Sequence, residues 1–185
     1  MKTLVVLSLI ILPIWWIFFL IWQPAVVHFV ANNSSPAIDR ALEYATRGGS
    51  QVEDIYFTKD EIAHLKDVSR LYTPISVTIS LLALGAWPVL IVAVVDKIKL
   101  QSSFKRAAKT LGVLVIVLLL CLALFPLFFE TFHEVLFPQG NWSFPADSML
   151  ITIFPEIFWK LILSSLIGAL GIFAALYWIL GNKNE

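Results

Sequence analysis

The chain has 185 residues, of which 59% are hydrophobic, and its mean hydropathy is +0.85. Soluble domains have an apolar content nearer about 45 to 50%, so this composition excludes a soluble globular protein and indicates an integral membrane protein. The 13 basic and 13 acidic residues cancel, which argues against a nucleic-acid-binding surface and leaves membrane lipids or membrane proteins as expected partners.

Four apolar segments are long enough to cross the hydrocarbon core of a bilayer, which takes about 20 helical residues. They are residues 3–27, 71–95, 111–129 and 156–180. The first is longer than the apolar core of a signal peptide, about 7 to 15 residues, so we expect it to be retained. The sequence therefore predicts an all-α polytopic membrane protein, residues 1–185 forming a single transmembrane domain with four transmembrane helices.

Charge predicts the orientation of these helices. The connection of residues 96–110 is rich in Lys and Arg, whereas residues 130–155 contain neither. Because short loops rich in Lys and Arg stay in the cytoplasm, we expect both termini in the cytoplasm and two extracytoplasmic loops, residues 28–70 and 130–155. All three histidines, His28, His64 and His133, then lie on the outer side.

The first outer loop contains a clear helix start. Thr58 and Glu61 fit a capping box, and Phe57 with Ile62 fits a hydrophobic staple. We expect a helix to begin at Lys59 and to continue into the second span.

His64 and Asp67 are three residues apart on this helix and share a face. At about 1.5 Å per residue, the imidazole lies roughly 10 Å before Leu71, where the apolar span begins. This is the depth of the lipid head groups and glycerol esters.

The second outer loop carries the third histidine among aromatic residues. If the third helix continues, Glu130 shares a face with His133 and would fix its tautomer. The alternative is that His133 is an interfacial residue with ordinary hydration. The aromatic side chains form an interfacial belt, line an acyl-chain pocket, or do both; they are Phe132, Phe137, Trp142, Phe144, Phe158 and Trp159.

Glu156 follows Pro155, a pair typical of a helix start. Residues 148–180 as one helix would be about 50 Å long, too long for a perpendicular span. We therefore expect a break at Pro155, with residues 149–154 at the membrane interface. Glu156 is either a helix-start residue or a support for an active site.

Motifs of other chemistries are absent from the sequence: there is no G-x-S-x-G elbow, H-E-x-x-H pair or P-loop. The spacing of His64, Asp67, His133 and Glu156 matches no standard metal motif. Cys121 is the single cysteine, which excludes an internal disulfide. We expect neither a metal nor a cofactor.

Three short runs resemble the bacterial lipoprotein intramolecular transacylase family: HLKDV at 64–68, FH at 132–133 and FPEIFW at 154–159. The resemblance extends from the first span to the fourth. Family members usually carry Met where this chain has Leu65, a departure that leaves His64 and Asp67 in place.

The resemblance implies an acyltransferase of the bacterial cytoplasmic membrane whose active site faces the extracytoplasmic side. Its partners would be diacylglyceryl-modified bacterial lipoproteins, whose sn-2 acyl chain would move to the α-amine of the N-terminal cysteine. His64 and His133 would be catalytic, and Asp67 would orient His64.

Two other classes remain open at this point. A small transporter more often carries an ionisable residue near mid-bilayer, and no Asp, Glu, Lys, Arg or His lies near the middle of a predicted span. A non-catalytic four-helix membrane protein, such as an assembly or accessory subunit, would not require the two imidazoles to meet. The distance between His64 and His133 therefore discriminates between the classes.

Overall fold

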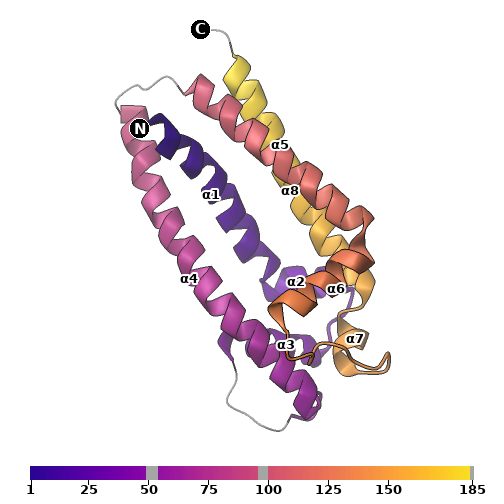
Figure 1. The fold of residues 1–185 in the computed structure, drawn as a ribbon. Helices are drawn as coiled ribbons and strands as arrows, with labels where there is room; N and C mark the ends of the chain where they lie inside the picture. Colours follow the sequence, from indigo (N-terminus) through magenta and orange to yellow (C-terminus); the bar gives the residue numbers. More distant parts are fainter. Residues whose placement is uncertain (49–53, 96–99, 184–185) are drawn as a thin grey trace. The chain divides into compact units, whose positions relative to one another are not determined.

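The computed structural model describes residues 1–48, 54–95 and 100–183, and these residues form helices and no strand. The helices are α1 (Lys2–Ile21), α2 (Pro24–Ala31), α3 (Pro36–Arg47), α4 (Lys59–Val95), α5 (Gln101–Ala123), α6 (Phe125–Leu136), α7 (Met149–Ile153) and α8 (Glu156–Asn182) (Figure 1). Among the described residues, α1, α4, α5 and α8 are long and apolar enough to cross a membrane. The predicted all-α fold with four transmembrane helices is confirmed. Part of the predicted cytoplasmic loop, residues 96–99, lies outside the described residues.

Two of the predicted spans have different ends. The apolar run 3–27 is divided, because α1 ends at Ile21 and α2 begins at Pro24. The run 111–129 is also divided, because α5 begins earlier, at Gln101, and α6 follows with Pro126 in its first turn. Proline has no N–H to bond the carbonyl four residues back, so an apolar run that contains it is readily split into two helices.

The predicted start of α4 is confirmed. The Thr58 N–H donates to Glu61 Oε2 over 2.8 Å, and the Glu61 N–H donates to Thr58 Oγ1 over 3.3 Å. Phe57 and Ile62 are buried in one cluster, as a hydrophobic staple requires. From Lys59 the helix continues without interruption into the second apolar segment.

The described chain divides into two compact units. The first consists of residues 1–20, 77–121 and 163–185, and holds most of the apolar helices. Here α1 packs against small side chains, Val5 and Leu9 meeting Ala93 and Ala107. A Cβ at Gly181 would lie 2.7 Å from Lys105 Cγ, so α8 closely approaches α5. Figure 1 shows the start of α1, the end of α4, the start of α5 and the end of α8 at one end of this unit.

The second unit consists of residues 21–76 and 122–162, and has its own hydrophobic core. Helix α3 contributes Ile38 and Tyr44, α4 contributes Leu65, and α7 contributes Ile153. Phe158 at the start of α8 joins the same cluster. This core anchors the first turns of α4, the turns that carry His64.

Candidate active site

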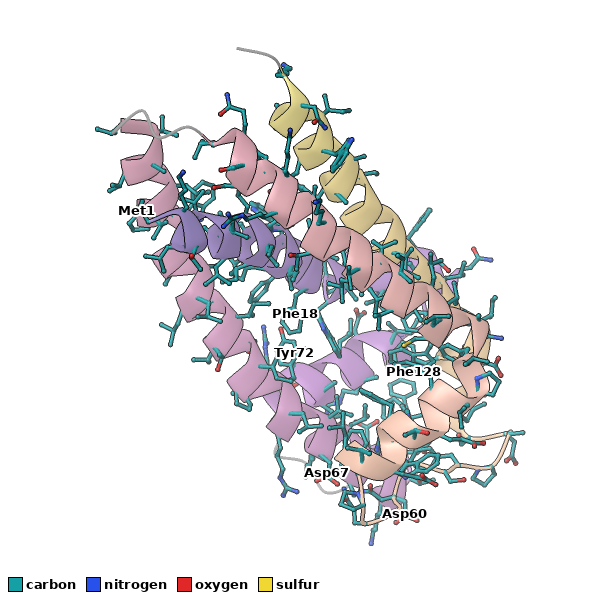
Figure 2. The ribbon with its side chains drawn as sticks, turned by 45° about the horizontal axis from the view of Figure 1, so that its top comes forward. Met1, Phe18, Asp60, Asp67, Tyr72 and Phe128 are labelled. Atoms are coloured by element: carbon teal, nitrogen blue, oxygen red, sulfur yellow. The ribbon has the colours of Figure 1, made fainter. Side chains whose placement is uncertain are left out.

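His64 and His133 lie close together in the second unit. His64 on α4 and His133 on α6 have ring centroids 6.0 Å apart and ring planes inclined by 30°. His64 is 9% exposed and His133 is half-buried. Figure 2 labels Asp67 on α4 and Phe128 on α6, the two helices that bring these imidazoles together. This proximity is the arrangement that a catalytic pair requires.

The imidazole of His64 lies before the membrane-spanning part of α4. A helix of 37 residues is about 55 Å long, well beyond the roughly 30 Å of hydrocarbon in a bilayer. Its early turns carry the charged residues Lys66, Asp67 and Arg70, whereas the uncharged apolar stretch begins at Leu71. We therefore assign these early turns to the region outside the span.

A backbone carbonyl fixes the tautomer of His133. Its Nδ1 donates to the Phe129 carbonyl oxygen over 2.7 Å. Because a carbonyl only accepts, the proton sits on Nδ1 and the neutral ring has a lone pair on Nε2. Burial lowers the pKa of His133, although the Phe129 bond opposes that effect. The expectation that Glu130 fixes the tautomer is corrected: Glu130 is exposed, and the carbonyl one helical turn before His133 does so.

His64 is enclosed by aromatic rings. The rings of Phe137 and Phe144 meet it edge-on, with centroids at 4.8 and 5.6 Å. Burial lowers the pKa of His64 to about 4, with the neighbouring His133 adding to the effect and Asp67 opposing it. The ring is therefore neutral near pH 7. Among the described residues its buried Nδ1 has no hydrogen-bond partner, a feature expected where a substrate supplies the partner.

Asp67 holds the connection between α6 and α7. Its Oδ2 accepts from Asn141 Nδ2 over 2.7 Å and from Gln139 Nε2 over 2.8 Å, and its Oδ1 accepts from Arg70. Burial alone would raise the pKa of Asp67, but these hydrogen bonds and the Arg70 charge outweigh it and lower the pKa. The hydrogen bonds of the Asp67 carboxylate therefore go to the loop and to Arg70, and its effect on the pKa of His64 is electrostatic.

Sequence reasoning missed Gln139 and Asn141. They flank Gly140, which has a positive φ of 77°, and a glycine between two amides is a common turn sequence. Nothing in that turn indicates a carboxylate partner more than 70 positions earlier in the chain.

The predicted aromatic residues divide into two groups. Trp142 and Phe132 lie against His133, with centroids at 5.1 and 5.2 Å, and Phe137 contacts both imidazoles. Phe158 and Trp159 instead pack against each other and against Phe154. Helix α6 also has an open apolar depression of about 280 Å³, lined by Phe128, Thr131, Phe132, Val135 and Leu136.

The environment of Glu156 supports the helix-start interpretation. Its side chain is 58% exposed and forms an ion pair with Lys160, one turn along α8. Among the described residues, no three His, Cys, Asp or Glu side chains group as metal ligands do. Glu156 therefore does not join His64, Asp67 and His133 in a ligand set.

The third histidine has a structural role. His28 Nδ1 bonds the Asn33 carbonyl and its Nε2 bonds Asp39 Oδ1, each over 2.9 Å. Both partners accept, so together they favour the doubly protonated ring, and these two bonds raise the pKa of His28. The imidazole joins α2 to α3 and has no free nitrogen for catalysis.

The chain is similar in sequence to a known family and in fold to a solved structure. Residues 4–159 match the model of a family described as lipoprotein intramolecular transacylase Lit. No curated protein sequence matches the chain. Among solved structures, the membrane integral lipoprotein intramolecular transacylase Lit from Bacillus cereus has a similar fold, with a TM-score of 0.68 at 16% sequence identity. The match covers 97% of this chain and 91% of that chain.

Proposed function

The chain belongs to the lipoprotein intramolecular transacylase family, whose members are acyltransferases, and from that premise we propose a specific reaction. The enzyme moves the sn-2 ester acyl chain of a diacylglyceryl-modified lipoprotein onto the α-amine of the lipoprotein's N-terminal cysteine. The product is an N-acylated lyso-lipoprotein. The observation that carries this proposal is the 6.0 Å separation of the His64 and His133 rings.

In the proposed step, the neutral amine nitrogen attacks the ester carbonyl carbon. A C–N bond forms, the bond from the acyl carbon to the sn-2 glyceryl oxygen breaks, and one proton passes from nitrogen to that oxygen. His133 is the base, because its Nδ1 already donates to Phe129 and the lone pair that can accept a proton is therefore on Nε2. A histidine with a lowered pKa is in the required neutral form at pH 7.

His64 is proposed to serve the oxygen side of the reaction. A neutral imidazole with one N–H donates a hydrogen bond to the carbonyl oxygen as negative charge develops there, and the proton that His133 has taken from the amine is then passed to the departing glyceryl oxygen, so that both imidazoles end neutral. Its enclosure by Phe137 and Phe144 strengthens such a bond by excluding water.

The reaction is intramolecular, so the enzyme gains most by holding amine and ester in an attack geometry. No acyl-enzyme is required, in agreement with the lack of a nucleophile motif in the sequence. The apolar depression on α6 offers a surface for an acyl chain beside His133.

We also propose that the site faces the extracytoplasmic side of the bacterial cytoplasmic membrane, with both termini in the cytoplasm. Arg106 and Lys109 of α5 line one surface depression together with Thr3 of α1. Positive charge near span ends favours the cytoplasmic side. Membrane lipids and lipoproteins are then the partners of the outer side.

Expression of the protein in a bacterium that makes only diacyl lipoproteins tests the reaction. We expect mass spectra of lipoprotein N-terminal peptides to show N-acyl lyso species that the parent strain lacks. If the protein is present in the membrane and only diacyl species are found, the transacylase proposal is wrong and a non-catalytic membrane protein is favoured.

The pH dependence of kcat/KM follows from the two proposed ionisations. A base is active when deprotonated, and the pKa of His133 is lowered from 6.5, so its contribution is lost only as pH falls below about 6.5. At higher pH, kcat/KM rises further as the substrate α-amine, whose pKa is about 7.7 to 8.0, loses its proton. Rates between pH 5 and 9 with a synthetic diacyl lipopeptide in micelles measure both. A lipopeptide with a less basic amine should shift only the rise at higher pH, which belongs to the amine. If the rise at lower pH shifts as well, its assignment to His133 is wrong.

A further inference from the structure

Asn141 has an unused acceptor in a buried position. Among the described residues, three buried side-chain polar atoms have no hydrogen-bond partner: His64 Nδ1, Ser103 Oγ and Asn141 Oδ1. Ser103 belongs to the first unit, whereas His64 and Asn141 both belong to the second. Buried polar atoms are normally paired, so an unpaired acceptor beside a proposed active site points to a donor on the substrate.

The orientation of the Asn141 amide is determined by chemistry. Its nitrogen donates to Asp67 Oδ2 over 2.7 Å. A carboxylate only accepts, so the nitrogen must face Asp67 and Oδ1 must point away from it. The acceptor therefore cannot be satisfied by rotating the amide, because that would lose the bond to Asp67.

Contacts on both sides connect Asn141 to the two imidazoles. The ring of the next residue, Trp142, lies against His133 with centroids 5.1 Å apart. On the other side, Asp67 lies one helical turn after His64 on α4. The Asn141 amide is thus bonded to the helix that carries the proposed oxygen-side donor, and the residue after it contacts the proposed base.

We propose that Asn141 Oδ1 accepts a hydrogen bond from the α-amine of the lipidated cysteine, and that Asp67 holds the Asn141 side chain in place. This inference rests on the proposed function and names the residue that recognises the attacking group. Asp67 itself is poorly placed to bind the amine, because its Oδ2 serves two amides and its Oδ1 serves Arg70.

A neutral amide oxygen suits this reaction better than a carboxylate. A carboxylate beside an ammonium group raises the pKa of that group and opposes its deprotonation. An amide oxygen accepts an N–H from the charged or the neutral amine, so it can fix the nitrogen without opposing proton transfer to His133. Such a bond uses an N–H and leaves the lone pair of the neutral amine free to attack the ester.

Direct binding of two unreactive probes tests this assignment. Both are glyceryl-cysteine lipopeptides with ether links in place of both esters; one has a free α-amine and the other a trimethylated amine with no N–H. We expect wild type to bind the free amine about tenfold more tightly, as expected for one hydrogen bond to a charged group. Asn141→Leu should bring the ratio of the two Kd values near one.

Gln139→Leu is the matched control, because it also removes one amide donor to Asp67 but leaves the Asn141 acceptor. It should keep the wild-type ratio. A ratio that persists in Asn141→Leu, or that falls equally in both variants, would overturn the assignment. If Asn141→Leu does not fold, the pair Asn141→Ala and Gln139→Ala is measured instead, under the same criteria.

Transfer activity is measured in parallel on the reactive diacyl lipopeptide, so the two proposals fail separately. If Asn141→Leu loses the preference for the free amine and wild type carries out transfer, the role of Asn141 is supported. Absence of transfer in wild type would contradict the proposed function, whatever the probes show.

Discussion

Alanine at His133 or at His64 is expected to lower kcat for N-acyl lyso-lipopeptide formation by about 10²- to 10⁴-fold, the usual contribution of a general acid or base. In the proposed mechanism, His133→Ala removes the Nε2 lone pair that accepts the amine proton, and His64→Ala removes the N–H donor on the oxygen side. Mass spectrometry of a synthetic diacyl lipopeptide incubated with enzyme in micelles measures the rate.

The third histidine supplies the control. His28→Ala removes an imidazole that bonds Asn33 and Asp39 in another part of the second unit, and it should leave kcat within about twofold, because His28 takes no part in the proposed reaction. The double variant lacking His64 and His133 should be little slower than the worse single variant, since paired groups act as a unit. Unchanged rates in both single variants would refute a histidine mechanism.

The parts of the fold that depend on local sequence could be predicted. The capping box of Thr58 and Glu61 and the break at Pro155 each involve residues within one helical turn, and both are found. The ends of the first and third spans were missed because hydropathy reports composition and not backbone hydrogen bonding. Pro24 and Pro126 lie in the first turns of α2 and α6, whereas Pro13 lies inside α1 without dividing it, so a proline in an apolar run does not by itself show where a helix ends.

The site depends on contacts between residues far apart in the chain, and local patterns contain no information about them. Spacing placed His64 and Asp67 on one face, but it could not show that the carboxylate accepts from Asn141 and Gln139. The pairing of His64 with His133 was expected only through the family resemblance. The Phe129 carbonyl was missed because any helical residue offers one, and only the side-chain rotamer selects it.

Glu61 illustrates the same limit, since only half of its role is visible in the sequence. It is 1% exposed, and its Oε2 accepts from both the N–H and the hydroxyl of Thr58. Its Oε1 accepts from the Leu150 N–H over 2.9 Å, in the first turn of α7. One carboxylate therefore caps the helix that carries His64 and also binds the helix that follows the aromatic loop.

Glu61→Ala is expected to destabilise the protein by about 3 to 5 kcal/mol, because each buried group left without its partner costs about 1 to 3 kcal/mol. For a chain of this size, that corresponds to a fall in Tm of roughly 6 to 20 °C. Glu61→Gln keeps one oxygen for Leu150 but turns an amide toward Thr58, so about half of the loss is expected. Circular dichroism during heating in micelles measures both.

Asp60→Ala is the matched control for Glu61. Asp60 precedes it in the same first turn of α4 but is exposed (Figure 2), so its loss removes only a helix-dipole interaction of about 0.3 to 1 kcal/mol and should lower Tm by no more than about 4 °C. Equal shifts for the two alanine variants would mean that the Leu150 bond contributes nothing. If Glu61→Ala also lowers kcat at temperatures where it remains folded, then the bond between α4 and α7 maintains the position of His64 as well as the stability of the second unit.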